Sequence, residues 1–389
     1  MENELLEETG YVGDIPEGWK WVKVEDFAEV VSGGTPSTDK PEFWNGDIAW
    51  ITPKDLSDFK FRYIDRGERN ISREGLENSN AKLLPRGTVL LSSRAPVGYL
   101  AIAKNELSTN QGFQNLIPKE NVISEFLYYL LKNNVEYLKS QASGTTFGEL
   151  SKSTLKKLIF LLPPLPEQKA IAEVLSSIDD KIELLHRQNK TLGEMAMTLF
   201  RQWFIEPTKD GLPEGWEEVS LGEIIEISSG KSIEKGKLKE KGLYPVLGAN
   251  GEIGRVDDWL YEGELIYTGR VGTLGNVFIV FKNEKVWLTD NTLVIRPKKN
   301  EYYYFVYFTL KNAKLDEYNS GSTQPLIRQS DIKKMEIFLP KINFLKDFEL
   351  ISRNIFTKIQ FNTFQIQTLE KLRDTLLPKL MSGEVRVKF

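Results

Sequence analysis

Residue types that build many enzyme sites are scarce in this sequence. It contains no cysteine and a single histidine, His186. A chain without cysteine forms no disulfide, no thiolate zinc site and no cysteine nucleophile, and one histidine cannot complete a common zinc site. Since His186 falls within a long helical pattern, we expect it to be a solvated helix residue.

The sequence also lacks long apolar runs and an excess of positive charge. No run of about 18 apolar residues occurs and the first ten residues are acidic, so neither a membrane span nor a signal peptide is predicted, and we expect a cytoplasmic protein. The formal net charge is −4. Because nucleic-acid binding depends on phosphate neutralisation by Lys and Arg, any such site must be a local basic patch, with part of the charge supplied by a partner.

Catalytic and cofactor motifs are missing as well. The segment Gly-Lys-Ser at residues 230–232 ends like a phosphate-binding loop, but Ile225 stands where that loop requires glycine. No dinucleotide-binding glycine pattern opens a helix, and no segment of the kind that amino-methyltransferases use is found. We therefore expect no cofactor, no metal and no catalytic residue in this chain.

What the sequence does contain is a long internal repeat. Pro-Glu-Gly-Trp occurs at residues 16–19 and again at 213–216, and the stretch from residue 143 to Pro163 matches the stretch from residue 320 to Pro340. The first copy carries about 20 more residues, mostly between Lys40 and Arg86. At 389 residues the chain exceeds one usual hydrophobic core, so we predict two related domains with different insertions.

Each copy reads as a mixed α and β domain. Short Val, Ile, Leu and Tyr runs broken by Gly and Asn indicate strands and turns, whereas residues 125–140 and 302–317 indicate helices. Within this frame the strand at residues 87–91, followed by Arg94, resembles the strand at 263–267, followed by Arg270. Asn110 likewise resembles Asn291.

Each domain is followed by a long helical pattern that begins near prolines. Apolar residues alternate at spacings of four and three in both patterns. The first set is Ile171, Leu175, Ile178, Ile182, Leu185, Asn189, Leu192, Ala196, Leu199 and Trp203, and the second is Phe348, Ser352, Ile355, Ile359, Asn362, Ile366, Leu369, Arg373, Leu376 and Leu380. Such heptads favour a coiled coil, with roughly 38 residues spanning about 57 Å. The alternative is two amphipathic helices that lie on their own domains.

The repeat implies a pseudo-two-fold relation, which sets the two helices antiparallel. We expect Asn189 to face Asn362, since any neighbouring register buries each amide against an apolar residue. The same register pairs Leu185 with Ile366, Ile171 with Leu380, and Trp203 with Phe348.

Polar residues in the two domains suit the recognition of base edges and phosphates. The candidates for DNA contact are Arg94, Asn110, Gln111 and Thr146 in the first domain, and Lys231, Arg270, Asn291, Thr323 and Arg328 in the second. Arg94 and Arg270 stand first among them because they follow matching strands. The alternative for each is a turn former or a solvated loop residue.

The order of these motifs resembles the specificity subunits of type I restriction-modification systems. The resemblance covers nearly the whole chain and is strongest in Leu-Leu-Pro-Pro-Leu-Pro-Glu-Gln-Lys-Ala-Ile-Ala at residues 161–172 and Ile-Asp-Asp-Lys-Ile at 178–182. It implies an α+β fold in which two repeated mixed α/β target recognition domains are separated by two long antiparallel coiled-coil helices. The implied boundaries are 1–163 and 207–340 for the domains, and 164–206 and 341–389 for the helices, the last with a C-terminal tail.

The resemblance also implies partners. Each domain would read one half of an asymmetric, two-part site in double-stranded DNA, and the helices would dock two modification (methyltransferase) subunits, which restriction subunits join. In the segments that carry the resemblance we assign Glu167, Gln168, Asp179 and Lys181 to partner binding. Taken alone, Asp179 reads as the outer face of a helix.

Two other classes of function stay open on sequence grounds. One is a stand-alone DNA-modifying enzyme with unrecognised catalytic residues, which binding of S-adenosylmethionine by the purified chain would favour. The other is a protein-binding scaffold, which an assembled complex without sequence-specific DNA binding would favour.

Overall fold

The structure is a computed structural model that describes residues 15–142, 148–319 and 325–387. The chain divides into two compact units. The first contains residues 1–187 together with 363–389, and the second contains residues 188–362. Each of the two long helices, α8 (Leu165–Phe200) and α11 (Ile342–Met381), contributes one end to each unit.

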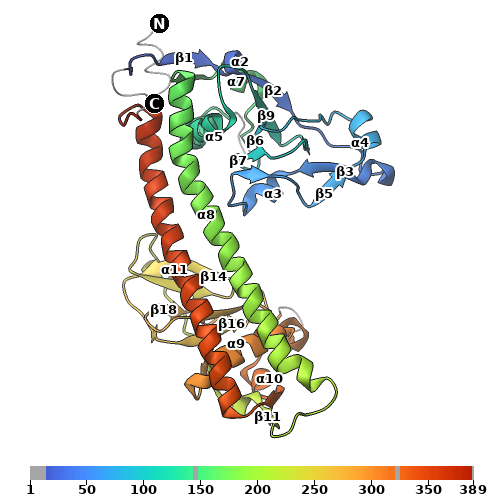
Figure 1. Cartoon of the computed structure of the whole chain (residues 1–389), viewed down its shortest axis with the longest axis vertical. Helices are drawn as coiled ribbons and strands as arrows, with labels where there is room; N and C mark the ends of the chain where they lie inside the picture. The colour runs from blue at the N-terminus through green and yellow to red at the C-terminus, as the bar shows by residue number, and fades with distance from the viewer. Residues whose placement is uncertain (1–14, 143–147, 320–324, 388–389) are drawn as a thin grey trace. The chain divides into compact units, whose positions relative to one another are not determined.

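The domain of the first unit is built on a five-stranded sheet of order β2-β9-β6-β7-β4, with a three-stranded sheet of order β5-β3-β8 beside it (Figure 1). The strands are β1 (Lys20–Lys23), β2 (Ala28–Ser32), β3 (Trp44–Ile51), β4 (Tyr63–Ile64), β5 (Arg69–Ile71), β6 (Val89–Ser93), β7 (Val97–Ala103), β8 (Ser108–Thr109), β9 (Phe113–Pro118) and β10 (Ile159–Leu162). The helices are α2 (Val24–Phe27), α3 (Pro53–Ser57), α4 (Arg73–Glu77), α5 (Ser124–Asn133), α6 (Val135–Ser140) and α7 (Lys152–Lys157), with a 3₁₀ turn at Pro41–Phe43.

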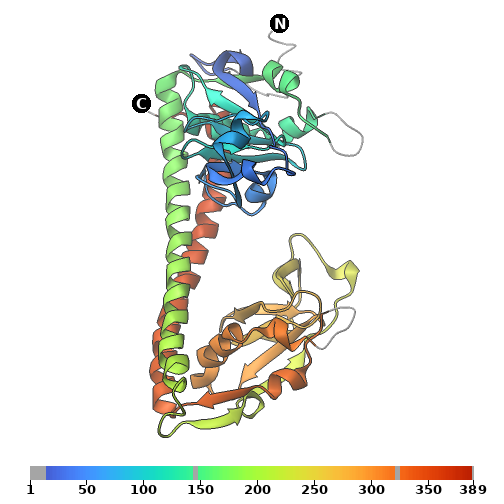
Figure 2. The same cartoon turned by 90° about the vertical axis from the view of Figure 1, so that its right-hand side faces the viewer.

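The domain of the second unit repeats this plan with sheets of order β12-β19-β16-β17 and β14-β13-β18-β15 (Figure 2). Its strands are β11 (Glu217–Ser220), β12 (Ile225–Ser229), β13 (Tyr244–Gly248), β14 (Gly251–Val256), β15 (Tyr261–Glu262), β16 (Leu265–Gly269), β17 (Val277–Val280), β18 (Lys285–Leu288), β19 (Thr292–Pro297) and β20 (Glu336–Leu339). The α-helices are α9 (Tyr303–Asn312) and α10 (Gln329–Lys333), and 3₁₀ turns span Leu221–Glu223, Lys235–Lys237, Asn300–Tyr302 and Leu315–Tyr318.

Each domain is closed by pairing of its first and last strands. β1 pairs antiparallel with β10, and β11 pairs in the same way with β20. The Pro-Glu-Gly-Trp motif turns the chain into the first strand, and its glycines, Gly18 and Gly215, have φ values of +85° and +78° that glycine adopts without steric cost. The repeated motif is therefore a turn that brings each domain's start beside the start of a long helix.

The extra residues of the first domain lie where the sequence comparison put them. Residues 40–86 contain β4 and α4, which have no equivalent in the second domain. β4 extends the main sheet by pairing parallel with β7. In the second domain β17 takes the place of β7 and is the edge strand of its sheet. The mixed α and β content and the unequal insertions predicted from the sequence are confirmed.

The predicted helices within the domains are shorter than expected. The helix at residues 125–140 is interrupted at Asn134, whose ψ of 21° leaves the helical range and whose side-chain nitrogen donates to the carbonyl of Leu130 at 2.8 Å. The helix at 302–317 ends at Asn312, and a separate turn follows. Asn competes well with helical hydrogen bonding, which accounts for the first break.

The helix pair is antiparallel in both units, as predicted. In the second unit Asn362 donates to Asn189 at 2.9 Å, and the rings of Trp203 and Phe348 lie 6.0 Å apart. In the first unit Leu185 and Ile366 share one buried cluster, and Ile171 and Leu380 share another. The helix α8 continues through a π-helical turn, Arg201–Ile205, which packs Phe204 into the second unit's core.

Candidate nucleic-acid interface

Both domains present the same polar edge, formed where three segments of the main sheet meet. In the first domain these are the end of β6, the turn between β8 and β9, and the loop after β2. The N–H of Ser93 donates to the carbonyl of Gly112 at 2.8 Å, and that of Gly33 donates to Phe113 at 3.2 Å. In the second domain Arg270 and Gly230 make the equivalent bonds to the carbonyls of Asn291 and Thr292.

This hydrogen-bond pattern corrects the predicted match between Arg94 and Arg270. The carbonyl of Ser93 accepts from Leu150 at 2.9 Å, and the carbonyl of Arg270 accepts from Ile327 at 3.0 Å, so Arg270 corresponds to Ser93. The second domain has one more residue between its turn glycine, Gly263, and the shared strand ladder, and this shifts the frame by one position.

The predicted match between Asn110 and Asn291 is wrong for a similar reason. The carbonyl of Asn110 accepts from Phe113 at 3.3 Å, and that of Thr289 accepts from Thr292 at 3.0 Å. Asn110 therefore corresponds to Thr289, and Asn291 corresponds to Gly112. All four predicted residues still lie on the shared edge, but the two domains place different side chain types at each position of it.

The first domain's edge offers an Arg, an Asn and a Gln. The Arg94 side chain is 39% exposed, and its only ion pair among the described residues is a long one, 3.8 Å to Glu149. Asn110 accepts from the N–H of Gly112 at 2.9 Å, which holds the turn, while the exposed Gln111 accepts from the hydroxyl of Thr35. Asn110 thus has a structural role, whereas Arg94 and Gln111 are each open to solvent in part and held by one contact each.

The second domain's edge carries Lys231, Arg270 and Asn291. Lys231 and Asn291 are exposed, and Arg270 is half-buried. Arg328 is exposed at the start of α10, where its N–H donates to Asp331 at 3.0 Å. The predicted residues Thr146 and Thr323 lie outside the described residues.

A tryptophan anchors the loop after the first sheet strand in both domains, which the sequence comparison missed. Trp50 of β3 donates from its indole nitrogen to the carbonyl of Gly34 at 3.0 Å. Trp287 of β18 makes the same bond, 2.9 Å long, to the carbonyl of Lys231, the residue that corresponds to Gly34. Because the two tryptophans come from different, neighbouring strands, no alignment of the repeats could have paired them.

The prediction that Glu167 and Gln168 bind a partner subunit is corrected by their burial. Glu167 is 0% and Gln168 is 1% exposed. Glu167 accepts from the indole of Trp19 at 3.0 Å and pairs with the guanidinium of Arg386. Gln168 bonds to the backbone of Asn121 and Pro163, at 3.0 Å each. Both side chains fasten the helix start to its own domain and the C-terminal tail, so they have no face left for a partner.

Asp179 is likewise occupied within the first unit rather than on an outer helix face. It accepts from the hydroxyl of Tyr129 at 2.7 Å and from Arg373 of α11 at 2.9 Å. Burial raises the pKa of Tyr129 far above its usual value, so the phenol stays protonated and acts as the donor. The neighbouring Asp180 pairs with Arg62 at 2.6 Å. Lys181 is exposed, and its role in partner binding stays a prediction.

The second domain is fastened to its helix by ion pairs of the opposite polarity. Here the helix supplies the cation, Arg353 of α11, which pairs with Glu264 of the domain and, at 2.6 Å, with Glu349 of the helix. In the first unit the domain supplies Arg62 and helix α8 supplies Asp180.

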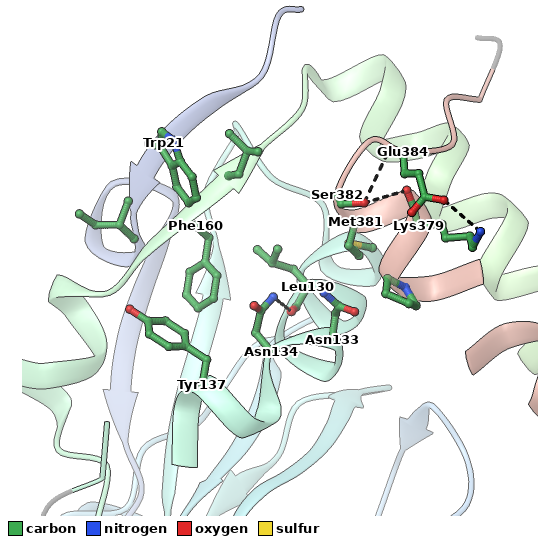
Figure 3. A pocket seen from close by; sticks show the side chains of 13 residues that line it. Trp21, Leu130, Asn133, Asn134, Tyr137, Phe160, Lys379, Met381, Ser382 and Glu384 are labelled. Carbon is green, nitrogen blue, oxygen red and sulfur yellow. Dashed lines mark hydrogen bonds and ion pairs between the residues drawn. The ribbon is translucent and has the colours of Figure 1, made fainter. Parts of the chain in front are cut away.

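One cavity of the first unit has a single carboxylate and no histidine among its lining residues, so it holds no paired carboxylates and no triad. This cavity of about 460 Å³ lies between the domain and the end of α11 in the first unit, lined by Trp21, Phe160, Tyr137 and the mutually paired Lys379 and Glu384 (Figure 3). No group of three or more His, Asp or Glu side chains there or elsewhere in the described ranges could hold a metal ion. His186 is half-buried against Phe61, with ring centres 6.2 Å apart, rather than solvated as predicted.

Comparisons with known proteins agree with this arrangement. The family model described as the type I restriction modification DNA specificity domain matches residues 16–194 and again residues 213–368. The chain is 39% identical to the type I restriction enzyme MjaIX specificity subunit of Methanocaldococcus jannaschii, over 97% of this chain and 96% of that protein. It is 26% identical to the EcoprrI specificity subunit of Escherichia coli, over 87% and 88% of the two chains.

A solved structure shares the fold. The type I restriction-modification S subunit from M. genitalium matches 96% of this chain and 98% of its own, with a TM-score of 0.61 and 21% identity. Within the described residues, no helix is both long enough and apolar enough to cross a membrane.

Proposed function

Since this chain belongs to the type I restriction-modification DNA specificity family, and is therefore a DNA recognition subunit rather than a catalyst, we propose that its two domains read the two halves of an asymmetric site in double-stranded DNA. The observation that carries this proposal is the shared polar edge. Two domains with the same hydrogen-bonded frame present different side chains on it, Arg94 and Gln111 in one and Arg270, Asn291 and Lys231 in the other. A shared backbone arrangement that carries different side chains in the two domains suits the reading of two different half-sites.

The chemistry of these side chains fits base edges and phosphates. Arg is suited to the O6 and N7 atoms of guanine, Gln and Asn to the N6 and N7 atoms of adenine, and Lys to phosphates. The net charge of −4 means that these contacts alone neutralise few phosphates. Tight binding therefore requires the partner subunits, and we expect the complex rather than the isolated chain to hold DNA in the cytoplasm.

We also propose that exposed residues of the long helices dock the two modification subunits, which restriction subunits then join. Lys181 and Leu184 lie one helical turn apart on α8, and both are exposed, Leu184 by 48%. An exposed leucine beside a lysine on a helix suits a protein interface with an apolar centre and a charged rim. Replacing Leu184 by Glu should weaken co-purification of the modification subunits and leave the fold of the isolated chain intact.

The experiment that tests the recognition proposal is mapping of methylated bases. The modification subunits encoded with this chain are expressed with and without it, and the methylated positions of the host DNA are sequenced. We expect a two-part motif that is methylated only when this chain is present. Methylation of the same motif without the chain, or of no defined motif with it, would refute the proposal.

A further inference from the structure

We propose that Arg69 reads a guanine in the half-site of the first domain, with its guanidinium positioned by a tryptophan shelf. This inference rests on the proposed function and names a specificity-determining residue that the repeat comparison could not find. Arg69 begins β5, the strand that pairs antiparallel with β3 in the smaller sheet of this domain.

The shelf consists of two tryptophans that lie under the arginine. The guanidinium carbon of Arg69 is 3.6 Å from the ring centre of Trp44 and 5.8 Å from that of Trp50. The two indoles pack edge to face, 5.0 Å apart, and are only 8% and 4% exposed. Trp50 is also the cross-strand partner of Arg69 in the β3–β5 pair, so the backbone ladder holds the arginine over the rings.

The shelf is joined to the polar edge of the domain. The indole of Trp44 donates to the carbonyl of Ser37 and that of Trp50 to the carbonyl of Gly34, both at 3.0 Å. These carbonyls belong to the loop after β2, and the hydroxyl of Thr35 in the same loop holds Gln111. Arg69 therefore belongs to the same structural assembly as the proposed DNA-reading edge.

The arginine is available for a ligand. It is exposed, and none of the carboxylates in the described part of the chain forms an ion pair with it. Its neighbour Glu68 is instead paired with Lys54 at 2.9 Å. Stacking uses the face of the guanidinium and leaves its N–H donors in the plane, where they can form two parallel bonds to guanine O6 and N7. Because the indoles fix the plane, less conformational freedom is lost on binding.

The test uses the complex with modification subunits and a duplex that carries the motif found by methylation mapping. Binding is measured for this duplex, for duplexes with each base pair of the first half-site replaced, and for a scrambled duplex. We expect Arg69→Ala to weaken target binding about ten-fold or more, with little change for the scrambled duplex. The variant should also lose discrimination at one G·C pair of the half-site.

Two further variants separate base reading from other roles. Arg69→Lys keeps the charge but not the forked donors, and we expect it to fail as Arg69→Ala does. Arg73→Ala removes a nearby exposed arginine of α4 that stacks on no ring among the described residues, and binding should be unchanged. Thermal unfolding of each variant reports whether the shelf still folds, and Arg69→Gln retains part of the aliphatic cover if Arg69→Ala does not fold.

Three results would overturn the inference. Equal losses on target and scrambled duplexes, restored by Arg69→Lys, would indicate a phosphate contact. If the Arg69 variants unfold at a lower temperature but bind DNA unchanged, the role of Arg69 is only to pack on the two indoles. Loss of discrimination in the other half-site would show that Arg69 does not read the half-site of the first domain. Failure of the wild-type complex to prefer the target over the scrambled duplex would instead refute the proposed function itself.

Discussion

Asn362 of helix α11 donates a hydrogen bond from its side-chain amide to the amide oxygen of Asn189 on α8, at a distance of 2.9 Å. Asn362 is 0% exposed, and the seam positions on either side of it are Ile359 and Ile366. A shift of either helix by one heptad would leave each amide facing an apolar side chain, at about 1–3 kcal/mol for each unsatisfied group. The amide pair therefore favours one alignment of the two helices over its neighbours.

The first prediction concerns this pair. Asn189→Leu should lower the free energy of unfolding by about 1–3 kcal/mol, because the buried Asn362 amide then keeps only its long, 3.4 Å hydrogen bond to Gln188. The double variant, in which Asn362→Leu is added, should recover most of that loss, since an apolar pair suits the seam. Denaturant unfolding of the two single variants and the double variant measures the coupling. Additive losses would show that the two amides act independently.

The second prediction concerns the buried Glu167. Arg386→Ala removes the guanidinium that neutralises this carboxylate and should destabilise the first unit by about 2–4 kcal/mol. Adding Glu167→Gln should restore much of the stability, because a neutral amide can still accept from the indole of Trp19. Thermal unfolding measures both effects. The double variant should also still bind the modification subunits. If a fully folded double variant fails to assemble with them, Glu167 takes part in partner binding after all.

The third prediction compares the two ends of one ion pair. Arg62 is buried and also donates to the hydroxyl of Tyr129 at 3.1 Å, whereas the Asp180 side chain is 64% exposed. Arg62→Ala should therefore cost about 2–3 kcal/mol and Asp180→Ala less than about 1 kcal/mol. Chemical denaturation of the two variants gives the comparison. Equal losses would mean that the exposed ion pair, rather than the buried hydrogen bonds, attaches the domain to helix α8.

The fourth prediction is a dependence of stability on pH. Burial raises the pKa of Glu349 above its ordinary value, although Arg353 and the N–H of Tyr304 oppose the shift. A raised pKa in the folded state means that protonation of Glu349 stabilises the fold. This contribution is complete below the unfolded pKa, near 4.5, and is lost as the pH rises through the folded pKa.

Glu349→Gln supplies the measurement for that prediction. The wild-type chain should lose stability relative to the variant as the pH rises through this window, and at pH 7 the variant should be at least as stable. Unfolding free energies of both chains between about pH 4 and 8 give the difference curve. A wild-type chain that gains stability relative to the variant over this range would show that the ion pair with Arg353 outweighs burial.

The features predictable from the sequence are those set by periodic burial. Heptad spacing correctly predicted both long helices. The repeat predicted that they are antiparallel, and the two core asparagines predicted the register in which Asn189 faces Asn362. The repeated Pro-Glu-Gly-Trp motif predicted two related domains, and in the structure its glycines adopt the same left-handed conformation in both copies.

The features missed depend on hydrogen bonds between distant segments. Arg94 and Arg270 were paired by similar strands, but one extra residue after Gly263 shifts the second frame, and only the backbone bonds of Ser93 and Arg270 reveal it. The burial of Glu167 was equally hidden, because its partners Trp19 and Arg386 lie near opposite ends of the chain. A charged residue at a helix start shows no sign of burial in the sequence until its distant partners are known.

The central claim, that each domain reads its own half-site, is tested most directly by exchange of residues 12–160 for the matching domain of another specificity subunit. The chimaera is expressed with the modification subunits, and the methylated motif is mapped by sequencing. We expect a new sequence in one half of the motif and an unchanged sequence in the other. A motif altered in both halves, or in neither, from a chimaera that assembles normally would contradict the claim.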